Sequence, residues 1–285
     1  MIGVLGINSY ICNYFINYVT KNTNKIERID CRNDTWKNIN FSLYETLLCP
    51  IGIAHVSTAP SMESKYYEVN RDLPVSIAKK AKNEGVKQFI FFSSMIIYGA
   101  DKPLGSEYVI DKNTVPEPEN FYGRSKLEAE NLLLNLEDKN FKITILRLPM
   151  VYGPGCKGNF PQLLKVAKYC PFCPNINNKR SMIYIDNLCE FLNMIIENKS
   201  CGVYYPQNSE YVSTIDIIRI AAKYFRHKIF FVKIFKPVIK GLSNKLSLIN
   251  KIFGTKVYDF SLSPETDKYN IIDFETSIKK CVESY

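Results

Sequence analysis

The 285-residue sequence contains only two histidines, one tryptophan and 13 glycines, and it has no apolar run of the roughly 18 residues needed to cross a bilayer. Its first residues, MIGVLGINSY, carry neither a basic segment nor a small-residue cleavage site, so we expect no signal peptide and a cytoplasmic protein with no membrane partner. A composition of 46% hydrophobic and 23% charged residues excludes disordered, collagen-like and coiled-coil chains.

Metal and disulfide motifs are also scarce. The nine cysteines include one C-x-x-C pair, Cys170 and Cys173, but no second pair that would complete a zinc site. His55 and His227 are far in sequence from each other and from that pair. We therefore expect reduced thiols, no metal, and a proline-rich loop at 170–173, with a metal or redox role for this pair as the alternative.

The net charge of +9 does not point to a nucleic-acid partner. Lysines are scattered along the chain, and no basic stripe with interleaved aromatic residues is present. A mildly basic surface can instead help to collect an anionic small substrate.

Short apolar runs alternate with amphipathic stretches over the first half of the chain. Strands that are apolar on both faces and separated by helices indicate a parallel sheet covered on both sides. We predict an α/β fold, a Rossmann-like doubly wound parallel sheet. The predicted strands are 1–5, 25–31, 51–57, 88–94 and 142–148, and the predicted helices are 9–21, 68–84 and 121–135.

The alternation stops near residue 151. Loop-rich sequence follows, and the last 85 residues show no repeating βα pattern. We predict a dinucleotide-binding domain over 1–150 that also includes 181–199, and a smaller C-terminal substrate-binding lobe made of 151–180 and 200–285.

The turn after the first strand is where this fold binds a pyrophosphate at a helix N-terminus. The positions of a G-x-x-G-x-x-G turn are Gly6, Ser9 and Cys12, so only the first is glycine. The Ser9 hydroxyl is suited to donate to a phosphate, and Cys12 is small enough for helix–strand packing. An ordinary βα turn is the alternative. The candidate cofactor contacts in this half of the chain are Gly6, Ser9, Tyr10, Ile11, Asp30, Arg32 and Ser57.

Asp30 ends the second predicted strand, 24 residues after Gly6. A carboxylate there can accept hydrogen bonds from the adenosine ribose, which favours NAD over NADP. The neighbouring Arg28 and Arg32 leave NADP possible, because an arginine can pair with a 2′-phosphate.

Ser94, Tyr122 and Lys126 are the candidate catalytic residues. Tyr122 and Lys126 are spaced i, i+4, which places them on one helix face, and Ser94 ends a predicted strand. A nearby ammonium would lower the pKa of the phenol, so that Tyr122 can exchange a proton with a substrate hydroxyl.

Several segments resemble the extended short-chain dehydrogenase/reductase superfamily, in its NAD-dependent nucleotide-sugar epimerase/dehydratase branch. The resemblance covers most of residues 1–200. It is carried by FIFFSSMIIYG (89–99), FYGRSKLEAE (121–130), ITILRLPMVYGPG (143–155), KRSMIYIDNL (179–188) and Asn70 in YYEVNRDLPV.

The resemblance implies a role for each matching residue. Ser94, Tyr122 and Lys126 form the triad, with Ser94 also touching substrate and Tyr122 and Lys126 also touching the cofactor. Asn70 braces the active site on the cofactor side, while Asn159 and Arg180 bind the nucleotide diphosphate. The implied cofactor is NAD, with NADP possible, and the implied partner is a UDP-hexose or UDP-4-keto-hexose used for surface polysaccharide precursors. We also expect a homodimer.

The departures from the family pattern narrow the reaction. Met95-Ile96 stand where 4,6-dehydratases carry Asp-Glu, so the acid–base groups for water elimination are missing and we reject a dehydratase. A C4 epimerase is the leading prediction and a UDP-4-keto-sugar reductase the first alternative, because both use the same triad. A small-carbonyl NADPH reductase and a non-catalytic dinucleotide sensor are the others.

Overall fold

A computed structural model describes residues 1–19, 26–53, 59–232, 250 and 252–285. The chain divides into two compact units. Unit 1 comprises 1–100, 115–148 and 189–206, and unit 2 comprises 101–114, 149–188 and 207–285. The observed division thus falls close to residue 150, but 101–114 and 181–188 belong to unit 2 and 200–206 to unit 1.

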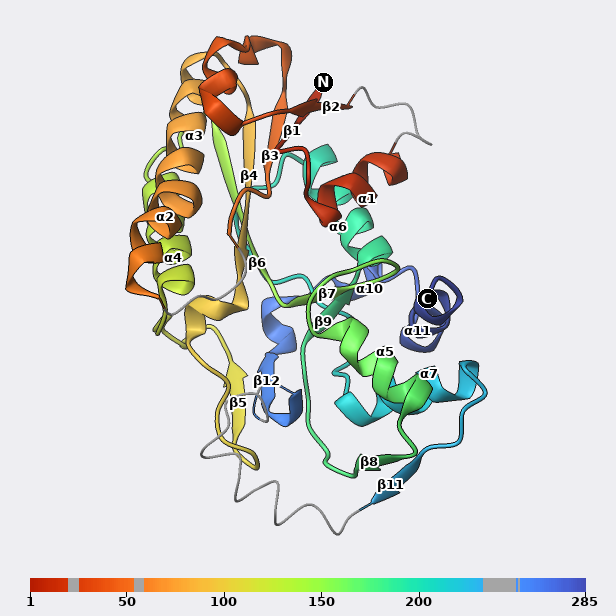
Figure 1. Ribbon diagram of the computed structural model, residues 1–285. Helices are drawn as coiled ribbons and strands as arrows, with labels where there is room; N and C mark the ends of the chain where they lie inside the picture. The colour runs from red at the N-terminus through yellow and green to blue at the C-terminus, as the bar shows by residue number, and fades with distance from the viewer. Residues whose placement is uncertain (20–25, 54–58, 233–249, 251) are drawn as a thin grey trace. The chain divides into compact units, whose positions relative to one another are not determined.

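Unit 1 is built on one parallel sheet. Among the described residues it has six strands in the order β10-β6-β4-β3-β1-β2, with α1 and α6 on one face and α2, α3 and α4 on the other (Figure 1). This confirms the Rossmann-like α/β prediction. The strands are β1 (Ile2–Leu5), β2 (Ile26–Ile29), β3 (Thr46–Cys49), β4 (Gln88–Ser94), β6 (Lys142–Leu148) and β10 (Gly202–Tyr204). The helices are α1 (Tyr10–Val19), α2 (Glu63–Tyr67), α3 (Leu73–Asn83), α4 (Phe121–Leu134) and α6 (Ile185–Glu197).

The core of unit 1 lies between the sheet and the helices that cover it. Phe89 and Phe91 of β4 are fully buried, as are Ile77 of α3 and Leu133 of α4. Each such side chain contributes roughly 1.5–3 kcal/mol by leaving water. The strands are apolar on both faces because helices cover both, which is why their sequence shows no polar alternation.

The predicted strand at 51–57 is wrong. The strand is β3, at Thr46–Cys49, and residues 51–53 are not in a strand, while 54–58 lie outside the described residues. Pro50 follows Cys49 and has no N–H to donate to the ladder, so pairing ends there. The register of β3 is set by its neighbours, with Thr46 opposite both Ile2 of β1 and Gln88 of β4.

The predicted helix 68–84 is part of a longer helical segment. It begins with α2 at Glu63, passes through a π-helical turn at Glu68–Asp72, and continues as α3 to Asn83. Gly85 has φ of +84°, which only glycine adopts easily, and it ends the segment as predicted.

Unit 2 consists of short elements. The strand pairs are β5 (Glu107–Ile110) with β12 (Thr255–Tyr258), β7 (Met150–Tyr152) with β9 (Met182–Tyr184), and β8 (Phe172–Pro174) with β11 (Phe230–Val232), all parallel. The helices are α5 (Phe160–Tyr169), α7 (Thr214–Tyr224), α10 (Thr266–Tyr269) and α11 (Phe274–Glu283). Over the described ranges, no helix combines the length and the apolar character that a bilayer crossing requires.

Candidate active site

A cavity of about 1040 Å³ opens in unit 1 where the strand order reverses, between β1 and β3. In open parallel sheets this switch point is where ligands bind, because the loops from the two strands diverge there. The cavity walls come from the ends of β1, β2 and β3 and from the helical segment 65–76, and they include Gly6, Ser9, Asp30, Arg32 and Gly52.

The turn after β1 keeps its first glycine for a conformational reason. Gly6 has φ of +90°, and its N–H donates to the Ile29 carbonyl of β2 at 2.7 Å. A residue with a Cβ atom is strained at such a positive φ, whereas glycine is not. The first glycine position of the predicted turn is therefore required by the backbone.

The other two turn positions act locally. The Ser9 hydroxyl accepts a hydrogen bond from the Cys12 N–H at 3.3 Å and so caps α1. Cys12 is almost fully buried, and burial raises the pKa of its thiol to about 12. Tyr10 and Ile11 form the first turn of α1 but do not line the cavity.

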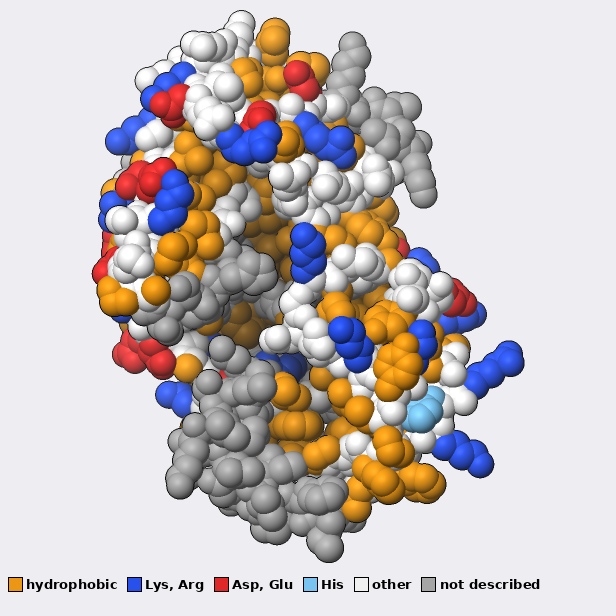
Figure 2. Space-filling view, in the orientation of Figure 1, with side chains coloured by type: hydrophobic (Ala, Val, Ile, Leu, Met, Phe, Trp, Pro, Cys, Tyr) orange, Lys and Arg blue, Asp and Glu red, His pale blue; other side chains and the backbone are white. Residues whose placement is uncertain are grey.

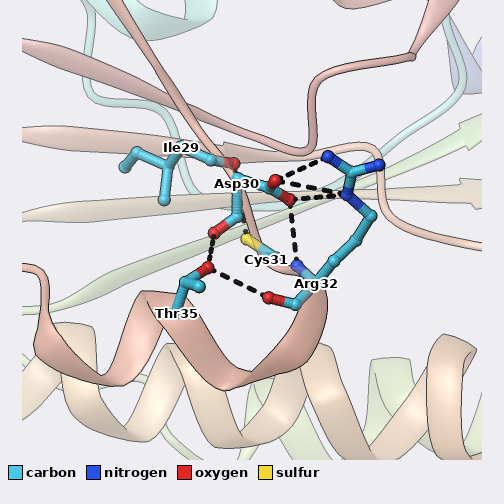
Figure 3. A network of polar contacts seen from close by, with 5 residues as sticks. All are labelled: Ile29, Asp30, Cys31, Arg32 and Thr35. Carbon is cyan, nitrogen blue, oxygen red and sulfur yellow. Dashed lines mark hydrogen bonds and ion pairs between the residues drawn. The ribbon is translucent and has the colours of Figure 1, made fainter.

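Asp30 and Arg32 form a fork at the end of β2 (Figure 3). Arg32 Nη2 lies 2.7 Å from Asp30 Oδ2, and Arg32 Nε and the Arg32 N–H each lie 3.0 Å from Oδ1. These hydrogen bonds lower the pKa of the Asp30 carboxyl to about 2. The carboxylate expected to accept from a ribose thus already has a charged partner, and both side chains line the cavity.

The residues of this cavity fit a dinucleotide. It offers a helix N-terminus at Ser9–Tyr10, the strained turn at Gly6 and an acid at the end of β2, which are the parts that hold the pyrophosphate and adenosine ribose in this architecture. Ser57, the remaining predicted contact, lies outside the described residues.

The structure brings Ser94 and Tyr122 together. Ser94 is the last residue of β4, and Tyr122 is in the first turn of α4, whose N-cap Asn120 accepts from the Gly123 N–H at 2.8 Å. The neighbouring Ser94 hydroxyl lowers the pKa of Tyr122, but burial outweighs this effect and the net shift of the pKa is upward. The prediction of a phenol pKa lowered by Lys126 is therefore wrong for this state.

The surroundings of Lys126 explain why it does not lower the pKa of Tyr122. Its side chain is buried one turn after Tyr122, and Nζ donates to the carbonyls of Ile51 at 2.9 Å and Phe92 at 2.8 Å. The ammonium is thus held by the loop after β3 and by β4. Burial lowers the pKa of Lys126 to about 8.

Asn70 braces the same loop from the π-helical turn. Its Oδ1 accepts from the Ile53 N–H at 2.7 Å, and its Nδ2 donates to Ser125 Oγ of α4 at 3.1 Å. A Cβ on Gly52 would lie 2.9 Å from Lys126 Nζ and 3.2 Å from Asn70 Oδ1, so glycine permits this close approach. The bracing role predicted for Asn70 has a direct counterpart in these contacts.

The sequence analysis missed a buried polar network behind the triad. The fully buried Glu130 lies one turn after Lys126 on α4 and accepts from the Ser93 hydroxyl and, at 2.7 Å, from Nη2 of Arg147 on β6. Arg147 Nη1 also donates to the hydroxyls of Tyr98 at 2.6 Å and Tyr205 at 3.0 Å. The spacing of Tyr122, Lys126 and Glu130 at i, i+4 and i+8 was the available signal.

In unit 2, Asn159 and Arg180 line one cavity of about 190 Å³. Arg180 is mostly buried. Its Nη2 donates to the Asn250 carbonyl at 2.9 Å, its Nη1 lies 3.8 Å from Asp101 Oδ1, and its Nε has no hydrogen-bond partner among the described residues. Burial lowers the pKa of Arg180, but guanidinium remains charged at any physiological pH. A buried cation beside a cavity suits an anionic ligand group.

The C-x-x-C pair lies at β8, with Cys173 inside the strand, so the proline-rich loop predicted at 170–173 gives way to a short strand from Phe172. Cys173 is buried, which raises the pKa of its thiol to about 11, and Cys170 precedes the strand. Both are free thiols, and the described residues contain no group of three or more His, Cys, Asp or Glu side chains placed to hold a metal.

Comparison with known proteins decides the family. The family described as "NAD dependent epimerase/dehydratase family" matches residues 4–205. The chain belongs to this family. It is therefore an NAD-dependent enzyme.

Individual relatives of this epimerase/dehydratase family member are as follows. The UDP-glucose 4-epimerase of Vibrio cholerae is 32% identical over 233 residues, 75% of this chain and 68% of its own length. The N-acetyl-alpha-D-glucosaminyl-diphospho-ditrans,octacis-undecaprenol 4-epimerase of Escherichia coli O157:H7 is 32% identical over 148 residues, 50% of this chain and 43% of its own length.

Solved structures share the fold. The UDP-glucuronic acid 4-epimerase of Bacillus cereus, in complex with NAD, has a TM-score of 0.75 at 17% identity and covers 99% of this chain and 95% of its own. The UDP-glucose 4-epimerase of Thermotoga maritima, with UDP-glucose, has a TM-score of 0.74 at 17% identity and covers 99% and 97%.

Proposed function

We propose that this epimerase/dehydratase family member is a UDP-hexose C4 epimerase that serves surface polysaccharide precursor synthesis. The observation that carries the proposal is the placement of Ser94 beside Tyr122, at the carboxyl edge of the sheet and one helical turn from the buried Lys126. The named activity of the Vibrio cholerae relative, which is similar over three-quarters of this chain, supports the same reaction.

The proton chemistry is assigned to Tyr122. The phenolate form of Tyr122 takes the proton of the sugar C4 hydroxyl and becomes a neutral phenol, and Ser94, which lies beside Tyr122, is placed to stabilise the phenolate before this transfer. NAD, when bound, supplies the acceptance and return of hydride at C4. Tyr122 then returns the proton to the C4 oxygen after the 4-keto sugar has presented its other face.

The substrate diphosphate is assigned to Arg180 and Asn159. Arg180 brings a buried charge and an Nε that is unpaired among the described residues, and Asn159 lines the same cavity. Charge-assisted hydrogen bonds of a guanidinium to a diphosphate are strong and directional. A small neutral ketone would not need this cation, which argues against the small-carbonyl reductase.

Dehydration remains rejected. Met95 and Ile96 open a 3-10 turn, Met95–Tyr98, directly after Ser94, and neither can transfer a proton. Elimination of water from the sugar requires an acid and a base, so the segment next to the catalytic serine favours epimerase or reductase chemistry.

The deciding experiment is turnover by the purified protein. We expect conversion of UDP-glucose to UDP-galactose, followed by chromatography, without added reductant and with NAD copurifying. Tyr122→Phe removes one hydroxyl and should lower kcat by about 10²–10⁴ while NAD binding is retained.

Three other outcomes would contradict the epimerase. Turnover of a UDP-4-keto-hexose only, with stoichiometric consumption of NADH or NADPH, would make the protein a reductase. NAD binding with no turnover of any of these sugars would make it a sensor. A Tyr122→Phe variant with more than half of wild-type activity would contradict the acid–base role of Tyr122. The homodimer stays a prediction, and light scattering of the same sample tests it.

A further inference from the structure

Three large aromatic side chains are exposed together at one end of unit 2. Tyr169 at the end of α5 is 65% exposed, Phe172 of β8 is 60% exposed and Phe230 of β11 is 62% exposed. Phe172 and Phe230 are paired across the two strands, with ring centroids 5.9 Å apart. We call these three residues the aromatic face.

Basic side chains surround the aromatic face. Lys168 Nζ lies 5.5 Å from the Tyr169 ring, and Lys165, Arg226 and Lys228 are exposed on the segments that lead into β8 and β11. Figure 2 shows apolar side chains over β8 and β11 with Lys and Arg side chains beside them. None of these four cations takes part in an ion pair within the described ranges, although the nearby Lys223 pairs with Glu275.

The sequence around this face has an unusual charge pattern. Residues 139–185 contain no Asp or Glu, and neither do residues 217–258, although the second stretch holds ten Lys and Arg. The cations therefore have no acidic neighbours in sequence to balance them. Clustered exposed apolar groups beside cations that have no ion-pair partner within the described ranges are features of an interaction surface.

We propose that the aromatic face docks on an anionic lipid bilayer surface. Aromatic side chains are stable at the headgroup boundary, where their rings leave water, and lysines near them are attracted by anionic headgroups. A second copy of this face fits poorly, because it would bring unpaired lysines against unpaired lysines. The proposal is independent of the sugar substrate and goes beyond the proposed function.

This differs from the expectation of no membrane contact. That expectation followed from the absence of a long apolar run, which excludes crossing a bilayer but not lying on one. Peripheral binding needs only a few interfacial aromatic residues and a basic surround, and both are present here.

The test is cosedimentation of the full-length protein with vesicles. The vesicles are either pure phosphatidylcholine or equal parts phosphatidylcholine and phosphatidylglycerol, and we expect binding to the second only, weakened by added salt. The combined variant Tyr169→Ser, Phe172→Ser, Phe230→Ser should bind at least about tenfold more weakly. Lys165→Glu with Lys228→Glu should weaken binding as well.

A matched control uses exposed apolar residues elsewhere. Leu43 and Val115 of unit 1 are 58% and 69% exposed, and Leu43→Ser with Val115→Ser should leave vesicle binding unchanged. An unchanged far-ultraviolet circular dichroism spectrum and an unchanged thermal unfolding midpoint show that each variant is folded.

Several results would overturn the proposal. They are no binding of wild type to anionic vesicles, equal binding by the aromatic variant, a dimer that the aromatic variant dissociates, and tighter binding to an RNA or DNA oligonucleotide that the vesicles cannot displace.

Discussion

At the scale of a single residue, we expect Lys126 to determine how kcat/KM depends on pH. Burial lowers its pKa from 10.5 to about 8, so the ammonium is lost over a range in which an exposed lysine stays charged. Lys126 does not lower the pKa of Tyr122 in this structure, but the proposed reaction requires its charged form, to stabilise the phenolate during turnover. We expect kcat/KM to fall above about pH 8, and Lys126→Met to have low activity without this fall.

Stability measurements separate this effect from unfolding. Between pH 8 and 10.5 the unfolded chain binds more protons at this position than the folded chain does. This group therefore makes the folded state more stable as pH rises, opposite to the loss of activity. A rate that stays constant up to the titration range of an ordinary lysine would contradict the assignment.

We expect the Asp30–Arg32 fork to govern the choice between NAD and NADP, because each side chain holds the other. Asp30→Ala releases the guanidinium to pair with a 2′-phosphate and removes a repelling charge, so NADP should bind more tightly than in wild type. Arg32→Ala releases the carboxylate to a ribose and should widen the preference for NAD. Fluorescence titrations of NAD and NADP measure both shifts. Shifts in the opposite direction would show that another cation, such as Arg28, contacts the 2′ position of the adenosine ribose.

At the scale of elements, the Glu130–Arg147 pair joins α4 to β6, and Ser93 ties β4 to the same carboxylate. Ser94 and Tyr122 sit on two of these elements, so the pair holds the catalytic groups in register. Removing one partner of a buried pair leaves an uncompensated charge, which destabilises by roughly 3–5 kcal/mol. We expect Glu130→Gln to lower the free energy of urea unfolding by this order and to lower kcat in the folded protein.

Glu128 provides the matched control on the same helix. It pairs with Arg71 at 2.7 Å, but its side chain is 44% exposed. Exposed pairs contribute about 0–1 kcal/mol, so Glu128→Gln should have little effect on stability or kcat. Equal effects of the two substitutions would mean that burial of the network is not what matters.

At the scale of the whole molecule, we expect the two units to carry different tasks. The triad and the dinucleotide cavity belong to unit 1, whereas Arg180 and Asn159 belong to unit 2. A substitution in unit 2 should therefore change substrate affinity more than chemistry. Arg180→Ala should raise KM for UDP-glucose by about tenfold to a hundredfold, with a smaller change in kcat and unchanged NAD binding.

A substitution at the neighbouring Lys179 distinguishes a specific contact of Arg180 from a general effect of positive charge. Lys179 is 56% exposed and faces Glu107, so Lys179→Ala should leave KM near wild type. Arg180→Lys keeps the charge but not the planar fork, and should give an intermediate KM. An unchanged KM in Arg180→Ala would contradict the binding of the substrate diphosphate in this cavity.

Much of unit 1 follows from local sequence. The apolar run 88–94 is β4, the segment 121–135 is α4 to within one residue, and the spacing of Tyr122 and Lys126 places them one turn apart. These features depend on side-chain periodicity and helix capping, which the chain carries locally. The family motifs around Ser94, Tyr122 and Asn70 follow from the same local segments.

Long-range contacts account for what local sequence missed. The strand at 46–49 depends on pairing with β1 and β4, the π-helical turn places Asn70 against the loop after β3, and Arg147 meets Glu130 across 17 residues. The upward pKa of Tyr122 and the downward pKa of Lys126 arise from burial by several elements at once. The sequence by itself therefore determined which residues we propose for the chemistry. Packing between distant segments set their protonation and their partners, because desolvation is a property of the assembled surroundings and not of any one segment.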